Sequence, residues 1–174
     1  DAACGTGLLG KEIVNLTKDD TAREWCLHGC DISEDMMEIA SPYYETLRRV
    51  DMNASLSQYP ADEFGAITCV GAFLEGHVFP NPALKEFLRI TKVGGVVLMT
   101  VRETFFESHF KLALEDVHKV ADIVVEDIAY LAGVNAKLVT LTKKSPQKKS
   151  TNHHIAMLGL GRMGSSMAKL FLAQ

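Results

Sequence analysis

The chain has 174 residues, of which 47% are hydrophobic and 23% are charged, so it is long enough to bury a sizeable core, and extensive disorder is excluded. Its formal net charge of -4 offers no general attraction to phosphate backbones, and no apolar run approaches the roughly 20 residues that a membrane helix needs. We therefore expect a small-molecule substrate, no nucleic-acid partner and no membrane association, and the oligomeric state stays open.

The cysteines are spread along the chain without the spacing of a metal site. Cys26 and Cys30 are four apart, but no second pair and no histidine cluster follows them, and Cys4 and Cys69 are isolated. The N-terminus has no charged-then-apolar signal pattern. These features predict reduced thiols, no metal ion and a cytoplasmic location.

The first half of the chain alternates predicted helices with predicted strands. A glycine turn at 5–7 is followed by apolar residues at helical spacing, which predict a helix over 8–16. Ser33 precedes two acids, which is typical of a helix start, and Pro42 ends that helix. The strands predicted in this half are 24–31, 45–50 and 64–70.

The second half continues the alternation and then changes to a hairpin. Asn81 and Pro82 predict the start of a helix that runs to Ile90, with Gly94 and Gly95 ending the unit. The elements predicted after them are a strand at 96–101, a helix near 104–119, a strand near 121–129, a turn at 133–135 and a strand at 136–142. This pattern predicts a doubly wound α/β sheet that is mostly parallel, with an antiparallel C-terminal hairpin.

The opening residues, Asp1-Ala-Ala-Cys-Gly-Thr-Gly7, form the most informative motif. A glycine turn before a helix lets the backbone approach a ligand, and the helix N-terminus presents free amide groups to it. An acid leads this turn, which suits a ligand without a pyrophosphate. Because the chain begins inside the turn, we expect its domain to be truncated and the first strand of its sheet to be missing.

Four further motifs follow in order. They are Gly29-Cys-Asp-Ile-Ser33, Asp51-Met52, Val70-Gly-Ala-Phe73 and the run from Leu84 to Gly95. Together with the opening motif they resemble class I S-adenosylmethionine-dependent methyltransferases, and most of all the methyltransferase-like proteins of the Williams-Beuren region. The resemblance covers about residues 1–143, and Ala3 departs from it where the family usually has glycine.

The resemblance implies a Rossmann-like methyltransferase sheet, S-adenosylmethionine as cofactor, and methyl transfer as the reaction. Asp31 would hold the ribose, Asp51 and Met52 would hold the adenine, and the loop from Asp1 to Gly7 would hold the methionine portion. The full set of cofactor-binding candidates is Asp1, Ala3, Cys4, Gly5, Thr6, Gly7, Asp31, Ile32, Met36, Asp51, Met52, Val70 and Gly71.

Several of these residues have other interpretations. Asp31 and Asp51 could be cap or turn acids, and Met36 and Met37 could pack in a core as readily as against an adenine. The alternative function is a binding or interaction module that keeps the fold without catalysis.

Histidines supply only a weak catalytic candidate. His77 follows the Val70-Gly-Ala-Phe73 motif. In the fold that the chain resembles, methyl acceptors often lie after this motif, so His77 is a possible general base. His109 and His118 are expected at the surface of a helix, and Trp25 is expected to pack in a strand.

The C-terminal region is predicted to form a separate element. A basic linker over 144–153 leads to a strand, glycine loop and helix start over 154–174. Its Gly159-x-Gly-x-x-Gly164 turn resembles the start of a β-hydroxyacid dehydrogenase, although the chain ends before the expected ribose-binding acid. This region could be part of an NAD-dependent oxidoreductase fusion, or residues 154–160 could replace the missing first strand.

Overall fold

The computed structural model describes residues 1–18, 26–131 and 133–146, apart from the side chains of Tyr130 and Leu131. The described chain forms two compact units, one ending at Asp51 and the other starting at Met52. Each unit is described by itself. The predictions for Trp25, for the glycine loop at 159–164 and for the replacement strand at 154–160 lie outside the described residues.

The first unit is built around two short parallel strands. Its elements are α1 (Leu8–Thr17), β1 (His28–Asp31), α2 (Glu34–Ala40), a 3-10 helix (Ser41–Tyr43) and β2 (Thr46–Arg49). Ala2 forms a parallel bridge with Cys30, so the residues before the glycine loop run beside β1. The N-terminal amino group of Asp1 donates to the His28 carbonyl at 2.7 Å, and Cys30 N–H donates to the Asp1 carbonyl at 3.0 Å.

The helices of the first unit begin and end as the sequence predicts. Ser33 precedes α2, and its hydroxyl accepts from Met36 N at 3.4 Å. Pro42 ends the regular helix, and the chain continues as the 3-10 turn. Within the described residues the predicted strand 24–31 begins too early, because β1 begins at His28 and residues 26 and 27 are not part of it. Its partner β2 begins at Thr46, and one further backbone contact precedes both strands, where Glu45 N–H donates to the Leu27 carbonyl at 2.8 Å.

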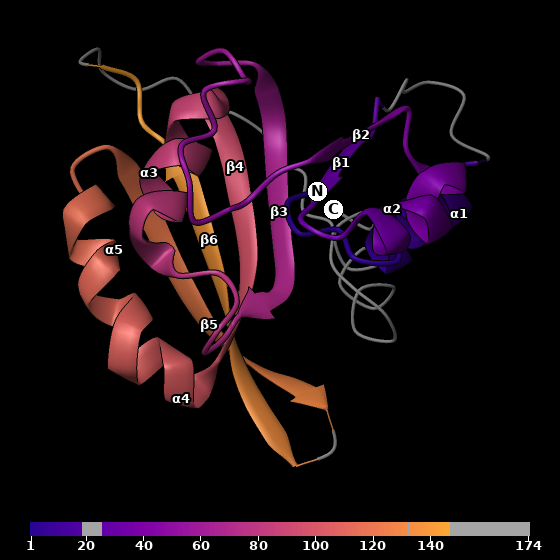
Figure 1. Ribbon diagram of the computed structural model, residues 1–174. Coiled ribbons are helices and arrows are strands. Elements are labelled where there is room, and N and C mark those ends of the chain that lie inside the picture. Colours follow the sequence, from indigo (N-terminus) through magenta and orange to yellow (C-terminus); the bar gives the residue numbers. More distant parts are fainter. Residues whose placement is uncertain (19–25, 132, 147–174) are drawn as a thin grey trace. The chain divides into compact units, whose positions relative to one another are not determined.

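The second unit is a four-stranded mixed sheet with helices packed on it. Its elements are β3 (Phe64–Phe73), α3 (Pro80–Ile90), β4 (Thr91–Arg102), α4 (Glu103–Phe105), a π-helix (Phe106–Phe110), α5 (Lys111–Val117), β5 (Ala121–Leu131) and β6 (Val134–Lys143). The strand order is β3-β4-β6-β5. β3 and β4 are parallel, whereas β6 is antiparallel to both β4 and β5, which confirms the predicted hairpin. α3 and α5 contact each other on one side of this sheet (Figure 1).

The predicted boundary at Gly94 and Gly95 is wrong, because both glycines lie inside β4. Thr91 pairs with Phe64, and the next pair joins Val96 to Ala66. Residues 92–95 therefore bulge out between two stretches of regular pairing. The glycines mark the bulge instead of a helix stop.

The predicted strand 64–70 is too short, because residues 71–73 also belong to it. β3 continues to Phe73, which pairs with Val101, while Cys69 pairs with Met99. Residues 70–72 face the single residue Thr100 and form a second bulge. Residues 67–69 are buried, as predicted for this apolar run, but Gly65 and Ala66 are exposed.

The start of α3 agrees with the predicted role of Asn81. This residue has extended backbone angles, with φ -113° and ψ 120°, so the regular helix begins at Pro82. The core of the second unit includes Phe73 and Phe110, whose rings meet edge to face at 4.8 Å between centroids. None of the helices in the described ranges is long and apolar enough to cross a membrane.

Candidate functional site

Three residues of the opening loop have left-handed backbone angles. Ala3, Gly5 and Gly7 have φ values of 54°, 53° and 79°, and the loop closes through Gly7 N–H donating to the Cys4 carbonyl at 2.9 Å. A β carbon on Gly7 would lie 2.9 Å from Ala40, so this position requires glycine for space as well as for φ. Ala3 lacks the usual glycine and still takes the left-handed angle, at an expected cost of about 1–2 kcal/mol.

Asp31 fastens this loop to the end of β1. Its side chain is buried, with 8% exposure, and Oδ2 accepts from Gly5 N–H at 2.8 Å while Oδ1 accepts from Ser33 N–H at 2.9 Å. Hydrogen bonds to a carboxylate are stronger than those between neutral groups, so the contacts hold the loop and the following turn in place. Each carboxylate oxygen can accept a further hydrogen bond, which a ligand hydroxyl could supply.

Tyr44 joins the loop to α1. Gly7, the N-cap of α1, has no side chain that could accept from the first turn, so its amides need other partners. The Tyr44 hydroxyl accepts from Gly10 N–H at 3.1 Å and donates to Asp1 Oδ2 at 2.6 Å. Burial raises the pKa of the Tyr44 hydroxyl, so it keeps the proton that Asp1 accepts.

No sequence motif marks Tyr44, although one signal existed. Gly10 stands inside a predicted helix, where glycine is unfavourable unless something packs close to it. A β carbon on Gly10 would lie 2.5 Å from the Tyr44 ring. The glycine therefore makes room for the tyrosine that supports the loop.

The Cys4 side chain points into the core of the first unit. It packs with Met37, Ala40 and Tyr44, and burial raises the pKa of its thiol to about 11, with a smaller contribution from the negative charge of Asp31. Cys4 is therefore a protonated packing residue. Its contribution to the predicted cofactor loop comes from the backbone.

The structure separates the two methionines that the sequence left ambiguous. Met37 is 8% exposed and belongs to the core, whereas Met36 is 45% exposed. A β carbon on Gly5 would lie 3.9 Å from the Met36 sulfur, so Met36 lies over the glycine loop. Ile32 is also exposed and directly follows Asp31. Two exposed apolar side chains thus flank the buried carboxylate.

Asp51 lies at the same edge as Asp31. β1 and β2 are parallel neighbours, and Val50 N–H donates to the Asp31 carbonyl at 2.8 Å. Asp51 directly follows Val50 and is exposed. Because the carboxyl ends of parallel strands meet at one edge, the first unit presents two acids there.

The remaining predicted residues belong to the second unit. Met52 is buried. Val70 is half-buried, and Gly71 is exposed with φ 73° in the bulge of β3, where its N–H donates to Thr100 Oγ1 at 2.9 Å. The threonine hydroxyl replaces the ladder bond that the bulge interrupts.

His77 lies in the loop after β3, and Asn53 fixes this loop. Asn53 Nδ2 donates to the His77 carbonyl at 2.7 Å, and Phe79 N–H donates to Asn53 Oδ1 at 2.8 Å. His77 itself is exposed. Asn53 bridges two backbone positions that no local pattern connects, so sequence reasoning did not find it.

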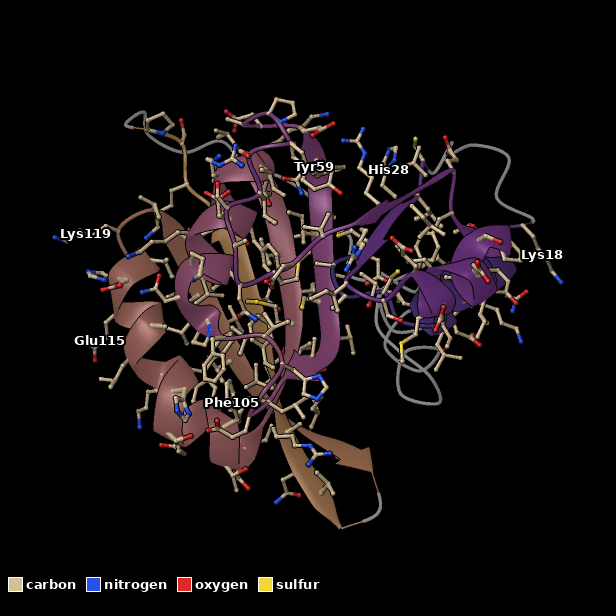
Figure 2. The ribbon with its side chains drawn as sticks, in the orientation of Figure 1. Lys18, His28, Tyr59, Phe105, Glu115 and Lys119 are labelled. Atoms are coloured by element: carbon tan, nitrogen blue, oxygen red, sulfur yellow. The ribbon has the colours of Figure 1, made fainter. Side chains whose placement is uncertain are left out.

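In the first unit, the cofactor-binding candidates that precede Met52 in the sequence therefore lie in one neighbourhood. Backbone and side-chain contacts of the opening loop, β1 and α2 hold this neighbourhood together. Those with direct contacts are Asp1, Cys4, Gly5, Gly7, Asp31 and Met36. His28 begins the strand on which this neighbourhood is built (Figure 2).

Comparison with known proteins indicates a methyltransferase, as the sequence motifs predict. Residues 1–95 match the family model described as a methyltransferase domain. The chain is 35% identical over 117 residues to human methyltransferase-like protein 27, which is 66% of this chain and 44% of that protein. The chain thus spans less than half the length of this curated relative.

Solved structures share the fold at low sequence identity. A protein assigned to the class I S-adenosylmethionine-dependent methyltransferases from Listeria monocytogenes has a TM-score of 0.66 and 17% identity, with 98% of this chain and 61% of that chain covered. A TehB-like S-adenosylmethionine-dependent methyltransferase from Corynebacterium glutamicum has a TM-score of 0.59 and 20% identity, with 83% and 78% covered.

The fold is thus that of the class I methyltransferases, an α/β class whose cofactor is S-adenosylmethionine. The chain belongs to the methyltransferase domain family. The resemblance to class I methyltransferases seen in the sequence is confirmed, whereas the dehydrogenase resemblance of the glycine turn at 159–164 stays a prediction.

Proposed function

We propose that this chain binds S-adenosylmethionine in its first unit and transfers the methyl group to a small-molecule acceptor. The observation that carries the proposal is the Asp31 carboxylate, which is buried and held by the amides of Gly5 and Ser33 beside the glycine loop. A charge kept at the end of a strand, next to a loop in which Gly5 and Gly7 lack β carbons, suits a ribose with two hydroxyl donors.

The loop and its surroundings fit the rest of the cofactor. Gly5 and Gly7 leave room for a ligand to approach the backbone, and the first amides of α1 follow the loop. In this proposal the loop holds the methionine portion, Met36 and Ile32 flank the adenine, and Asp51 accepts from its amino group. The bound cofactor supplies a reactive methyl sulfonium, and the protein aligns the acceptor and excludes water.

The residues of the second unit enter the proposal through the family resemblance. Met52 would contact the adenine, and Val70 and Gly71 would belong to the loop motif that follows the fourth strand of the family. Within the second unit, the bulge at Gly71 supports this role, because it exposes a glycine backbone. His77 stays a weak candidate for a base.

Calorimetry on the full 174-residue chain tests the proposal. S-adenosylmethionine is titrated into one sample and NADH into another, because the second glycine loop at 159–164 predicts a nicotinamide ligand if it is functional. We expect saturable binding of S-adenosylmethionine and none of NADH. A folded sample that binds NADH alone would replace the methyltransferase proposal with an oxidoreductase one. A sample that binds neither ligand would favour a non-catalytic module.

A further inference from the structure

The strand β5 is at one end of the strand order in the second unit, and within the described residues it pairs with β6 alone (Figure 1). Its antiparallel ladder with β6 is regular from Ala121 to Ala129. Such an edge is a template for a further strand, and natural proteins usually interrupt it with proline, lysine or a bulge. The stretch 121–129 has none of these three features. The outer edge of β5 can therefore accept another strand.

The backbone groups that face outward follow from the register of the ladder. Lys144 N–H donates to the Val120 carbonyl at 2.8 Å, which continues the pairing of β5 with β6. Hydrogen-bonded and non-hydrogen-bonded pairs alternate in an antiparallel ladder, so the even-numbered residues of β5 bond to β6. No hydrogen bond to the outward groups occurs within the part of the chain that the structure describes. The outward groups belong to the odd-numbered residues, which include Ile123, Val125 and Asp127.

The centre of this edge exposes apolar side chains on both faces of the strand. Val124 is 52% exposed and Val125 is 40% exposed. Consecutive residues of a strand point to opposite faces, so the two valines lie on different faces of the sheet. A strand added at this edge would cover part of both, and burial of apolar surface favours the addition.

Acidic side chains flank the two valines, and lysines lie beside two of these acids. Asp122 Oδ1 lies 3.2 Å from Lys144 Nζ. The Asp127 carboxylate pairs with Lys137 on β6. The third acid on β5 is Glu126, which is exposed. The position of these acids decides which strand can be added, because like charges directly opposite each other destabilise a ladder.

We propose that the added strand is β5 of a second copy of this chain, paired antiparallel around a twofold axis at Val125. In this register Val125 lies opposite its own counterpart, and Ile123 lies opposite Asp127 of the second copy. The outward backbone groups of both copies then meet in hydrogen-bonded pairs, because all of them belong to odd-numbered residues. A twofold interface of this kind is self-complementary and closed.

The charges of β5 favour this register over its neighbours. Each acid lies opposite an apolar residue, with Asp122 opposite Ile128 and Glu126 opposite Val124. A shift by two residues is the smallest that keeps the same backbone groups facing each other. In one direction it places Glu126 opposite Asp122, and in the other it places Glu126 opposite its own counterpart. Both shifted registers therefore bring like charges together, and the register centred on Val125 does not.

Sedimentation velocity of the full chain over a concentration series measures the association, with a reducing agent present because Cys26 is an exposed free thiol. A single pair of edge strands is a small interface, so we expect a dissociation constant of roughly 10–100 μM. Val125→Glu places two acids at the twofold axis and should weaken association at least about tenfold. Val93→Glu is the matched control and should associate like the wild type, because Val93 is also exposed in the second unit but belongs to β4.

Hydrogen exchange on the wild type tests the register itself. Protection of the Ile123 and Val125 amides should rise with protein concentration, whereas the Val124 amide should be protected at every concentration because it bonds to β6. This readout needs no variant, so it also serves if Val125→Glu does not fold by circular dichroism. A wild type that stays monomeric, a dimer with unchanged protection at Val125, or equal association of Val125→Glu and Val93→Glu would each overturn the proposal. The surface belongs to the second unit, so none of these outcomes depends on the proposed binding of S-adenosylmethionine.

Discussion

Replacing Tyr44 by phenylalanine removes one hydroxyl and tests how the opening loop is supported. The change deletes the acceptor of Gly10 N–H and the donor to Asp1 Oδ2, both at a buried ring. A buried group left without its partner costs about 1–3 kcal/mol, and a bond to a carboxylate is at the upper end of that range. We expect Tyr44→Phe to lower the free energy of unfolding by about 2–4 kcal/mol.

Urea unfolding followed by circular dichroism measures this loss, and Tyr43→Phe is the matched control. Tyr43 is the preceding residue, and its hydroxyl makes no hydrogen bond within the described part of the chain, so its removal should cost less than about 0.5 kcal/mol. Hydrogen exchange at Gly10 gives a local readout, and its protection should fall in Tyr44→Phe alone. If the two variants lose equal stability, Tyr44 does not cap α1 as we describe.

Three further predictions concern the same unit. Gly7→Ala should destabilise the protein by at least about 3 kcal/mol, because its β carbon would lie 2.9 Å from Ala40 at a φ of 79°. Gly5→Ala should cost only about 1–2 kcal/mol, since the Met36 sulfur, the nearest atom beyond the adjacent residues, is 3.9 Å from its β carbon, and equal losses in urea would refute this difference. The Cys4 pKa rises from 9.0 to about 11 on folding, so its stabilising contribution is complete below pH 9.0 and is lost as the pH rises toward about 11. Urea unfolding at pH values of about 8 and 10.5 should show a loss of roughly 1–2 kcal/mol that is smaller in Cys4→Ala, and identical losses would exclude this titration.

Local signals predicted the positions of most elements. Ser33 with its following acids marks the start of α2, and the proline after Asn81 marks the regular start of α3. Both depend on residues that are adjacent in sequence, so a single chain shows them. The hairpin at the C-terminal side followed in the same way from a glycine turn between two apolar runs.

Glycines whose role depends on strand pairing could not be interpreted locally. A glycine at position 94 is typical of the end of a helix, but Gly94 lies in a bulge of β4 between Thr91 and Val96. Gly71 lies just beyond the predicted strand 64–70, but in the structure it belongs to a bulge of β3 opposite Thr100. In both cases pairing with the neighbouring strand determines where the regular hydrogen bonds are interrupted, and a single sequence does not show that register.

Parts of the candidate site were predictable, and others depend on packing. The acid at Asp31 follows from the end of a strand, but its two amide donors appear only in the folded loop. Met36 and Met37 are neighbours in sequence, and only the packing of α2 shows that Met37 is in the core. Tyr44 acts across 34 residues on Gly10, a distance over which no motif connects them.

The central claim is that Asp31 makes the first unit a binding site for S-adenosylmethionine. Calorimetric titration of S-adenosylmethionine into Asp31→Ala and Glu38→Ala, each compared with the wild type, tests it most directly, since Glu38 is an exposed acid on the neighbouring helix α2. We predict that Asp31→Ala weakens binding at least about tenfold while Glu38→Ala binds like the wild type, because only Asp31 holds the loop and offers acceptors to a ribose. Equal affinities of the two variants would contradict the account.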